Sequence, residues 1–180
     1  RWARGVIAGD GAGGCILRQC GPGSVRCRTD ALTVVIHRPV LFHPDNEDLT
    51  MYGFASTIQG TSFGEALAHT IELLKEEGFG VLSDIDVQAT MKAKLGVDMR
   101  GYRILGACHP QLAHKALLAE PDIGLLLPCN VVVRPEAEGR VTVAFIDPLV
   151  MMEMVNKPEV QAVAQDAEQR LRRACTQLTQ

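Results

Sequence analysis

The stretch LLLPCNVVVRPEAEGRVTVAFI, residues 125–146, decides the fold. Its two apolar runs, LLLPCNVVV and RVTVAFI, are rich in β-branched residues, and the loop RPEAEG with Gly139 separates them, which is typical of a β-hairpin. A hairpin makes at least one antiparallel pair, so the chain is not a doubly wound parallel sheet. The sequence therefore predicts an α+β domain.

Pro128 and Cys129 lie in the middle of the first of these two runs. Proline has no N–H to donate to a sheet, and strands tolerate it at an edge or at a bulge, where side chains are turned in a new direction. We therefore expect a bulge at Pro128 that turns Cys129 or Asn130 toward a pocket. The alternative is that Pro128 ends the pairing of an edge strand and that Cys129 is a small core residue.

Helix and strand patterns alternate around the hairpin. Ser62 and Glu65 match a capping box ahead of an apolar stripe, and Gly78 suits the end of that helix, with Phe79 placed to touch Leu74. Further helices are expected to begin at Asp86, Pro110, Asp147–Pro148 and Lys157–Pro158. Strands are expected at 51–58, 79–87 and 101–108. In the second of these strands, the side chains expected to face the core are those of Val81, Ile85 and Val87.

Four blocks of sequence resemble a known family: DVQAT (86–90), LGACHP (105–110), LLPCNVVV (126–133) and VAFIDP (143–148). In order and spacing they are similar to the family called domain of unknown function 302, over about residues 51–178. The resemblance implies a two-layer α+β sandwich, with a mainly antiparallel sheet and helices on one face, similar in topology to one repeat of the TATA-box-binding protein. It also implies small intracellular proteins that often self-associate, and it supplies no reaction.

Residues 1–50 differ from the remainder of the chain, because they contain six Arg but no Lys and no Met. We expect a poorly ordered N-terminal extension over 1–50, with a short strand at Leu32–Ile36, and a single domain over 51–180. Glycines 9, 11 and 14 match a dinucleotide-binding pattern. The residues that follow are too interrupted by Gly and Pro to open a helix, so we do not expect nucleotide binding there.

Composition argues against several classes of protein. The formal net charge is −3, and no basic patch interleaved with aromatic residues suggests nucleic-acid binding. No apolar run approaches the length of a membrane span, and no signal-peptide pattern is present. The six cysteines form no C-x-x-C, which argues against a zinc ribbon and a thioredoxin-type site. We expect a cytoplasmic protein with reduced thiols.

Cys108 and Cys129 are the leading candidates for a functional site. Cys108 comes at the end of one expected strand, directly before a helix, and Cys129 lies in the next strand along the chain. The two thiols lie close together if the strands are neighbours. A helix N-terminus stabilises a thiolate, so we expect a lowered pKa for Cys108 and the highest reactivity among the thiols.

A second candidate is a polar cluster in and around the second expected strand, the short helix and the third strand, which could hold an anion or a small polar ligand and consists of Asp84, Asp86, Thr90, Lys94, Tyr102 and Arg103. Thr90 and Lys94 are one turn apart and share a face, with Asp86 nearby. The alternative is a helix cap with a solvated face. We expect no metal and no cofactor, because the neighbours Cys108 and His109 point to opposite sides of a strand. The MMEM run, 151–154, is expected to supply core and surface methionines.

The leading functional hypothesis is an intracellular accessory module that binds a small ligand or carries a reactive thiol. Its ligand site would consist of Cys108, Cys129, Asn130, Asp86, Thr90 and Lys94. One alternative is a thiol-dependent enzyme with Cys108 as nucleophile and His109 or His114 as base. Another is a structural dimerisation module. A homodimer with a small-molecule ligand is the expected state.

Overall fold

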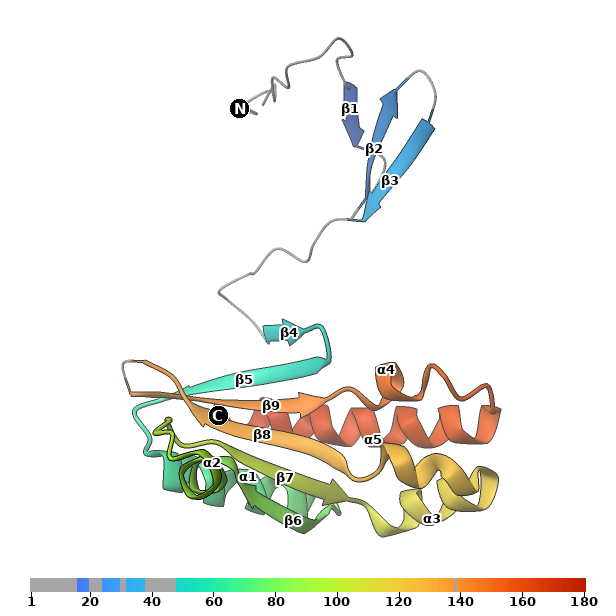
Figure 1. Ribbon diagram of the computed structural model, residues 1–180. Helices are drawn as coiled ribbons and strands as arrows, with labels where there is room; N and C mark the ends of the chain where they lie inside the picture. Colours follow the sequence, from blue (N-terminus) through green and yellow to red (C-terminus); the bar gives the residue numbers. More distant parts are fainter. Residues whose placement is uncertain (1–15, 20–23, 30–31, 38–47, 138) are drawn as a thin grey trace. The chain divides into compact units, whose positions relative to one another are not determined.

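The computed structural model of the chain describes residues 16–19, 24–29, 32–37, 48–137 and 139–180 (Figure 1). The chain divides into two units, Arg1–His43 and Pro44–Gln180. In the first unit β1 (Ile16–Gln19), β2 (Ser24–Thr29) and β3 (Leu32–His37) form an antiparallel sheet in that order. β3 lies where a short strand was expected, whereas β1 and β2 were not predicted. The glycine pattern at 9–14 lies outside the described residues, and the poor order of residues 1–50 stays a prediction.

The second unit contains a six-stranded sheet in the order β4-β5-β9-β8-β7-β6, and every neighbouring pair is antiparallel. The hairpin from which the fold was predicted joins β8 to β9, with Val131 opposite Phe145 and Val133 opposite Val143. The α+β class is therefore confirmed. The strands are β4 (Asp48–Thr50), β5 (Gly53–Gln59), β6 (Gly80–Asp86), β7 (Arg103–Cys108), β8 (Cys129–Pro135) and β9 (Arg140–Ile146).

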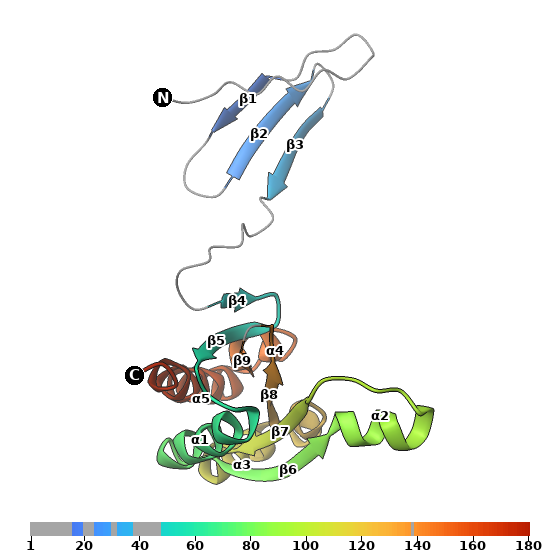
Figure 2. The same cartoon turned by 90° about the vertical axis from the view of Figure 1, so that its left-hand side faces the viewer.

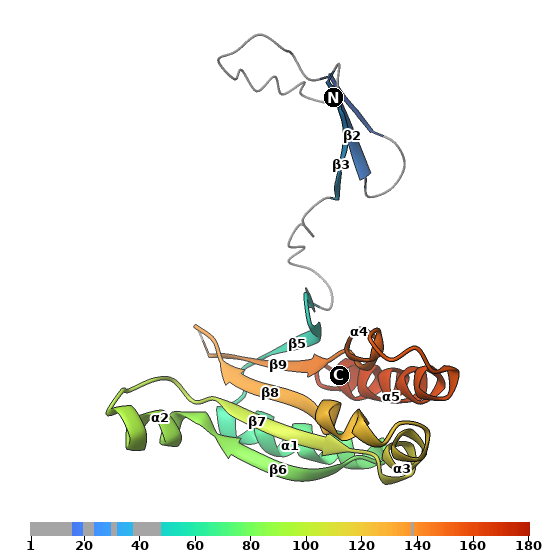
Figure 3. The same ribbon diagram turned by 45° about the vertical axis from the view of Figure 1, so that its right-hand side comes forward.

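Two long helices, α1 (Phe63–Glu76) and α5 (Pro158–Gln177), cover one face of this sheet (Figure 2). The short helix α2 (Val87–Leu95) extends beyond the end of the strands, and α3 (Pro110–Ala119) lies at the opposite end of the unit (Figure 3). The 3₁₀-helix η1 (Pro121–Leu126) and α4 (Pro148–Met152) complete the elements. The two-layer arrangement follows the expectation, and the likeness to a TATA-box-binding-protein repeat stays a prediction.

Local sequence signals explain both ends of α1. The Ser62 hydroxyl accepts a hydrogen bond from the Glu65 N–H at 3.2 Å, and the Glu65 carboxylate accepts one from the Ser62 N–H at 2.9 Å, so the capping box is complete. At the other end Gly78 has a φ of 85°, and the Phe79 N–H donates to the Leu74 carbonyl at 2.8 Å. This is the expected Schellman ending, which needs a residue that tolerates positive φ.

The structure corrects the prediction for the first half of LLLPCNVVV. Residues up to Leu126 belong to η1, the Leu127–Pro128 peptide bond is cis, and β8 begins only at Cys129, opposite Ala107. The strand starts there because Pro128 has no N–H to pair with β7. The pairing of β7 with β8 is regular, so the bulge predicted at Pro128 is wrong. A register shift occurs instead in β6, between Val81 and Ser83.

The buried residues form two clusters that α5 connects. The C-terminal half of α5 packs on the sheet and α1, with Leu171 and Cys175 fully buried. Its N-terminal half packs against α3, η1 and α4 through Val160 and Ala164. Each fully buried leucine or valine stabilises the fold by about 1.5–3 kcal/mol. The second cluster consists of Ala116, Ile123, Met152, Val160 and Ala164.

The outer strand β6 differs from the pattern expected for it. Ile85, predicted to face the core, is 48% exposed, because the register shift between Val81 and Ser83 pairs it with Ile104 and so turns it to the other face of the sheet from Val81, which pairs with Ala107. Among the described residues, no helix has the length and apolar character needed to cross a membrane.

Candidate functional site

The candidate site is a small cavity at the point where β7 ends and β8 begins. Cys108 is the last residue of β7 and Cys129 is the first of β8, and both line the cavity. The two strands are hydrogen-bonded neighbours, with Cys129 directly opposite Ala107. The condition set for a shared site, that the strands of the two cysteines are neighbours, is therefore met, and both residues line one cavity.

The walls of the cavity are almost entirely apolar, and they come from both buried clusters. Phe79 and Leu112 belong to the cluster on the sheet, whereas Ala116, Met152 and Ala164 belong to the second cluster. Several wall positions on α3 and α5 carry alanine, whose short side chain leaves the space open. The cavity has a volume of about 30 Å³, enough for about two water-sized molecules.

Burial controls the chemistry of the two thiols. Cys129 is 6% exposed, and burial, with a smaller contribution from the neighbouring Cys108, raises the pKa of its thiol to about 12. Cys108 is half-buried, and burial also raises the pKa of its thiol. The expectation of a lowered pKa at Cys108 is therefore wrong. The N-terminus of α3 favours the thiolate, but the loss of hydration has the larger effect here.

His109 forms part of the cavity wall and is the N-cap residue of α3. Its ring meets the edge of Phe79, with 5.5 Å between the ring centres, and a Cβ atom at Gly78 would lie only 2.8 Å from its Nε2. Its Nδ1 is buried and has no hydrogen-bond partner among the described residues. Burial, followed by the positive charge of Arg170, lowers the pKa of His109, so the ring is mainly neutral at pH 7.

The residues of the second candidate, the polar cluster, lie at the other end of the β6–β7 pair. Gly80 is opposite Cys108, whereas Asp86 is opposite Arg103, so about 20 Å of strand separates the two places. Asp86 Oδ1 accepts from the Ala89 N–H at 2.8 Å, and the Thr90 hydroxyl donates to the Asp86 carbonyl at 2.7 Å. These contacts cap α2, as the alternative interpretation of the cluster required.

Arg103, one of the residues predicted for this cluster, binds two of its carboxylates. Its Nε donates to Asp84 Oδ1 at 2.7 Å, and its guanidinium also reaches Asp86 Oδ2 at 3.4 Å. Lys94 is exposed on α2. The cluster is therefore a helix cap joined to a partly exposed ion-pair network, and Asp86 and Thr90 are already engaged in it.

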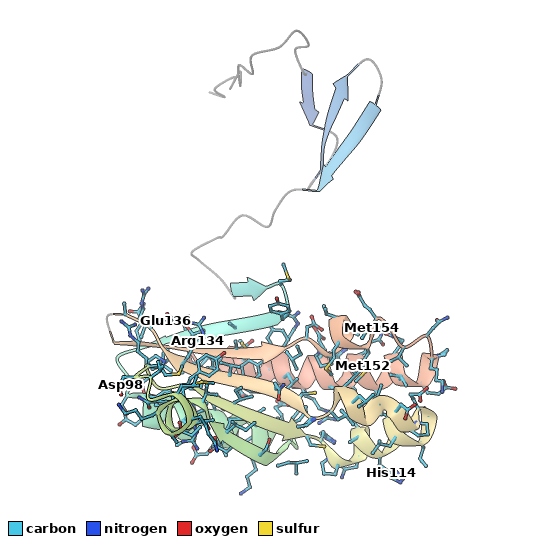
Figure 4. All side chains as sticks on the ribbon, in the orientation of Figure 1. Asp98, His114, Arg134, Glu136, Met152 and Met154 are labelled. Atoms are coloured by element: carbon cyan, nitrogen blue, oxygen red, sulfur yellow. The ribbon has the colours of Figure 1, made fainter. Side chains whose placement is uncertain are left out.

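The remaining predicted residues also lie away from the cavity. Asn130 is exposed and lies opposite Gly106, on the face of the sheet that Cys129 does not face. His114 is exposed on α3 and points away from the unit, so it is not placed to act as a base for Cys108 (Figure 4). The structure brings together Cys108, Cys129 and His109, and it separates them from Asn130, Asp86, Thr90 and Lys94.

The structure adds wall residues that the sequence analysis did not assign to a site, chiefly Phe79 and Met152. Met152 points into the interior, whereas Met154 is 81% exposed (Figure 4). The expected division of the MMEM run into core and surface residues is confirmed. No signal in the sequence links Met152 to Cys129. The described part of the chain contains no group of three or more His, Cys, Asp or Glu side chains suited to a metal ion.

Fold and cavity together define an α+β domain with two thiols at one end of an antiparallel sheet. Residues 54–178 match the family described as "Domain of unknown function DUF302", so the chain belongs to this family. It is similar to the crystal structure of an uncharacterized conserved DUF302 protein from Bacillus stearothermophilus, with 31% sequence identity and a TM-score of 0.63. That similarity covers 72% of this chain and 99% of the other. No curated protein matches the chain.

Proposed function

We propose that this protein is a non-catalytic module that binds a small thiophilic ligand at Cys108, in the cavity that Cys108 shares with Cys129. The observation that carries the proposal is that two free cysteines line one apolar cavity of about 30 Å³. Polarizable sulfur atoms and apolar walls suit a soft group of two or three heavy atoms rather than a charged metabolite.

The electrostatics of the cavity support binding over catalysis. A nucleophilic cysteine needs a depressed pKa or an adjacent base that removes its proton, and burial raises the pKa of both thiols here. His109 contributes a neutral ring whose buried Nδ1 has no partner among the described residues. A bound ligand with a polar atom would satisfy this nitrogen, because an unpaired buried nitrogen is unfavourable.

The two other hypotheses have weaker support. A thiol-dependent enzyme with Cys108 as nucleophile requires a thiolate that the burial of Cys108 disfavours. A purely structural module leaves the shared cavity and the unpaired His109 nitrogen without a role. The proposal also places the protein in a reducing compartment such as the cytoplasm, where both thiols stay free.

The experiment compares adducts of increasing size at Cys108 in the full chain. Methyl methanethiosulfonate adds an S–CH₃ group to a thiol, whereas N-ethylmaleimide adds a much larger ring. Wild type and Cys108→Ala are treated identically at pH 8.5, so that the difference between them isolates Cys108 from the other cysteines. Peptide mass spectrometry confirms the modified positions, and thermal melts measure stability.

We expect the methylthio group at Cys108 to leave the melting temperature unchanged or to raise it, because the group enters existing apolar space. The maleimide ring does not fit and lowers the melting temperature, by about 2–4 °C for each kcal/mol lost. Ala113→Leu fills the cavity from α3, so in this variant the methylthio group at Cys108 should lower the melting temperature. If the methylthio group destabilises wild type as much as the maleimide does, the proposal fails.

A further inference from the structure

His109 belongs to the part of the cavity wall that lies closest to solvent. Most residues that line the cavity are buried, and the partly exposed ones are Cys108, His109, Ala113, Leu127 and Val163. Among these five, His109 has the one side chain that gains a charge as the pH falls below 7. The protonation of His109 can therefore decide whether solvent reaches the cavity.

The His109 ring lies against the turn that joins α1 to β6. A Cβ atom at Gly78 would lie 2.8 Å from His109 Nε2, so the ring fits in this place because residue 78 is glycine. The ring also meets the Phe79 ring at an angle of 85° between the two planes. These contacts cover Phe79, which lines the cavity, so a ring that turned outward would uncover the cavity at this point.

The turn itself is held by α5 and is not free to follow the ring. Arg170 donates to the Glu77 carbonyl at 3.4 Å, and Arg173 donates to the Glu77 carboxylate at 2.7 Å. The second contact also pairs the charge of Glu77. Because these bonds fix the backbone next to Gly78, a movement of His109 separates the ring from the turn.

A positive charge on the buried ring is unfavourable. His109 Nδ1 is buried and has no hydrogen-bond partner among the described residues, whereas a protonated ring carries a proton on both nitrogens. The positive charges of Arg170 and Lys115 oppose protonation, and Asp166 favours it. Asp166 is paired with Arg170 at 2.7 Å, so its attraction for the ring is offset by the charge beside it.

The closed position of the ring therefore depends on pH. Burial, followed by the positive charge of Arg170, lowers the pKa of the buried ring below its ordinary value of 6.5, which a ring turned into water keeps. As the pH falls, the ring in water takes up a proton first, so the closed position is favoured above pH 6.5 and is lost progressively below it. Cys108 and Cys129 stay neutral in this range, because burial raises the pKa of both thiols.

We propose that the His109 ring closes the ligand cavity at neutral pH and turns outward at acid pH, so that acidification favours exchange of the ligand at Cys108. The inference rests on the proposed function, because it concerns access to the same cavity. It requires a change in one side chain at the first turn of α3 and no change in the sheet.

Labelling of Cys129 between pH 5 and pH 8 tests this proposal in the full chain. Peptide mass spectrometry gives the initial rate with methyl methanethiosulfonate, in the folded chain and in the chain unfolded in urea at the same pH. The ratio of the two rates is the protection of Cys129, and it cancels the fall in thiolate with pH. We expect protection to decrease at least about threefold from pH 7 to pH 5, since one proton shifts the equilibrium by up to about tenfold per pH unit.

Variants at position 109 identify the group that titrates. His109→Gln and His109→Phe cannot be protonated, so they should remove the pH dependence, whatever their absolute protection. His109→Lys is charged throughout and should leave Cys129 weakly protected even at pH 8. His114→Gln is the matched control, because His114 is an exposed histidine of the same helix and should not alter the wild-type profile. Cys175 is fully buried and does not line the cavity, so its protection should stay constant.

Three results would overturn the proposal: equal protection of Cys129 at pH 5 and pH 7, a pH dependence that persists in both neutral variants, and a parallel loss of protection at Cys175, which would mean that the whole unit unfolds. The proposed function fails separately. Its adduct comparison is made at pH 8.5, where the ring is neutral, so a failure there would overturn the ligand site but not the movement of the ring.

Discussion

Raising the pH from 8 to 11 should destabilise this protein through Cys129. The pKa of its thiol is about 12 in the folded chain, against an ordinary value of 9.0. The unfolded chain therefore releases the thiol proton first. Stability from this group is complete below pH 9 and is lost as the pH rises from 9 toward 12. Between pH 8 and pH 11 the loss from this one thiol is about 2–3 kcal/mol.

The measurement is urea unfolding of the full chain at both pH values in the presence of a reductant, followed by helical circular dichroism. All described helices lie in the unit Pro44–Gln180, so for the described residues the signal reports the unit that contains Cys129. Lysine and tyrosine side chains titrate in the same range, so the comparison is with Cys129→Ala, which keeps those groups and removes the thiol.

Wild type should lose about 2–3 kcal/mol more than Cys129→Ala over this pH interval, whatever the absolute stability of the variant. Cys108→Ala should remove a smaller part of the pH dependence, because Cys108 is only half-buried. Equal losses in wild type and Cys129→Ala would refute the reasoning, since they would mean that the Cys129 thiolate is solvated in the folded protein.

Three further changes test the fold. Gly106→Ala should lower the free energy of unfolding by about 1–3 kcal/mol, because a Cβ there would lie 2.6 Å from Pro128 Cγ. Gly64→Ala is the control, because Gly64 has open space around it, and this variant should be neutral or stabilising by up to about 1 kcal/mol. Equal melting temperatures of the two variants would contradict the crowding argument. Ser62→Ala should lower the free energy of unfolding by about 1 kcal/mol through loss of the capping box, and an unchanged urea midpoint would rule out that contribution. Deletion of residues 1–43 should leave the helical signal and a cooperative melt, because the six-stranded sheet lies in the second unit; a non-cooperative melt would count against independent folding.

The parts of the fold that were predictable depend on signals confined to a few neighbouring residues. Ser62 and Glu65 begin α1, Gly78 ends it, and prolines mark the starts of α3, α4 and α5. Such signals act through backbone N–H groups and φ angles within one turn, so they keep their meaning in any tertiary context. The antiparallel hairpin was predictable for the same reason, because its two strands are close in sequence.

The predictions that failed depend on strand register and on burial by distant segments. Ile85 has the sequence pattern of a core residue, but the register shift between Val81 and Ser83 turns it to the other face of the sheet. The pKa of Cys108 depends on cover from α3 and α5, which the sequence around Cys108 does not reveal. Asp86, Thr90 and Lys94 lie far from Cys108 because the β6–β7 pair places Asp86 and Cys108 at opposite ends, and Asn130 faces the side of the sheet that Cys129 does not face.

The boundary between the two buried clusters also determines how the cavity can open to solvent. Packing within each cluster is continuous, whereas the cavity lies where the two meet, with α5 as the element that runs through both. Contiguous packed units open separately and at lower cost than the whole domain unfolds. A tilt of α3 and η1 away from the sheet would admit solvent to Cys129 while the sheet stays intact. The rate at which this buried thiol exchanges its proton with solvent therefore measures the local separation of the two clusters and not the stability of the whole protein.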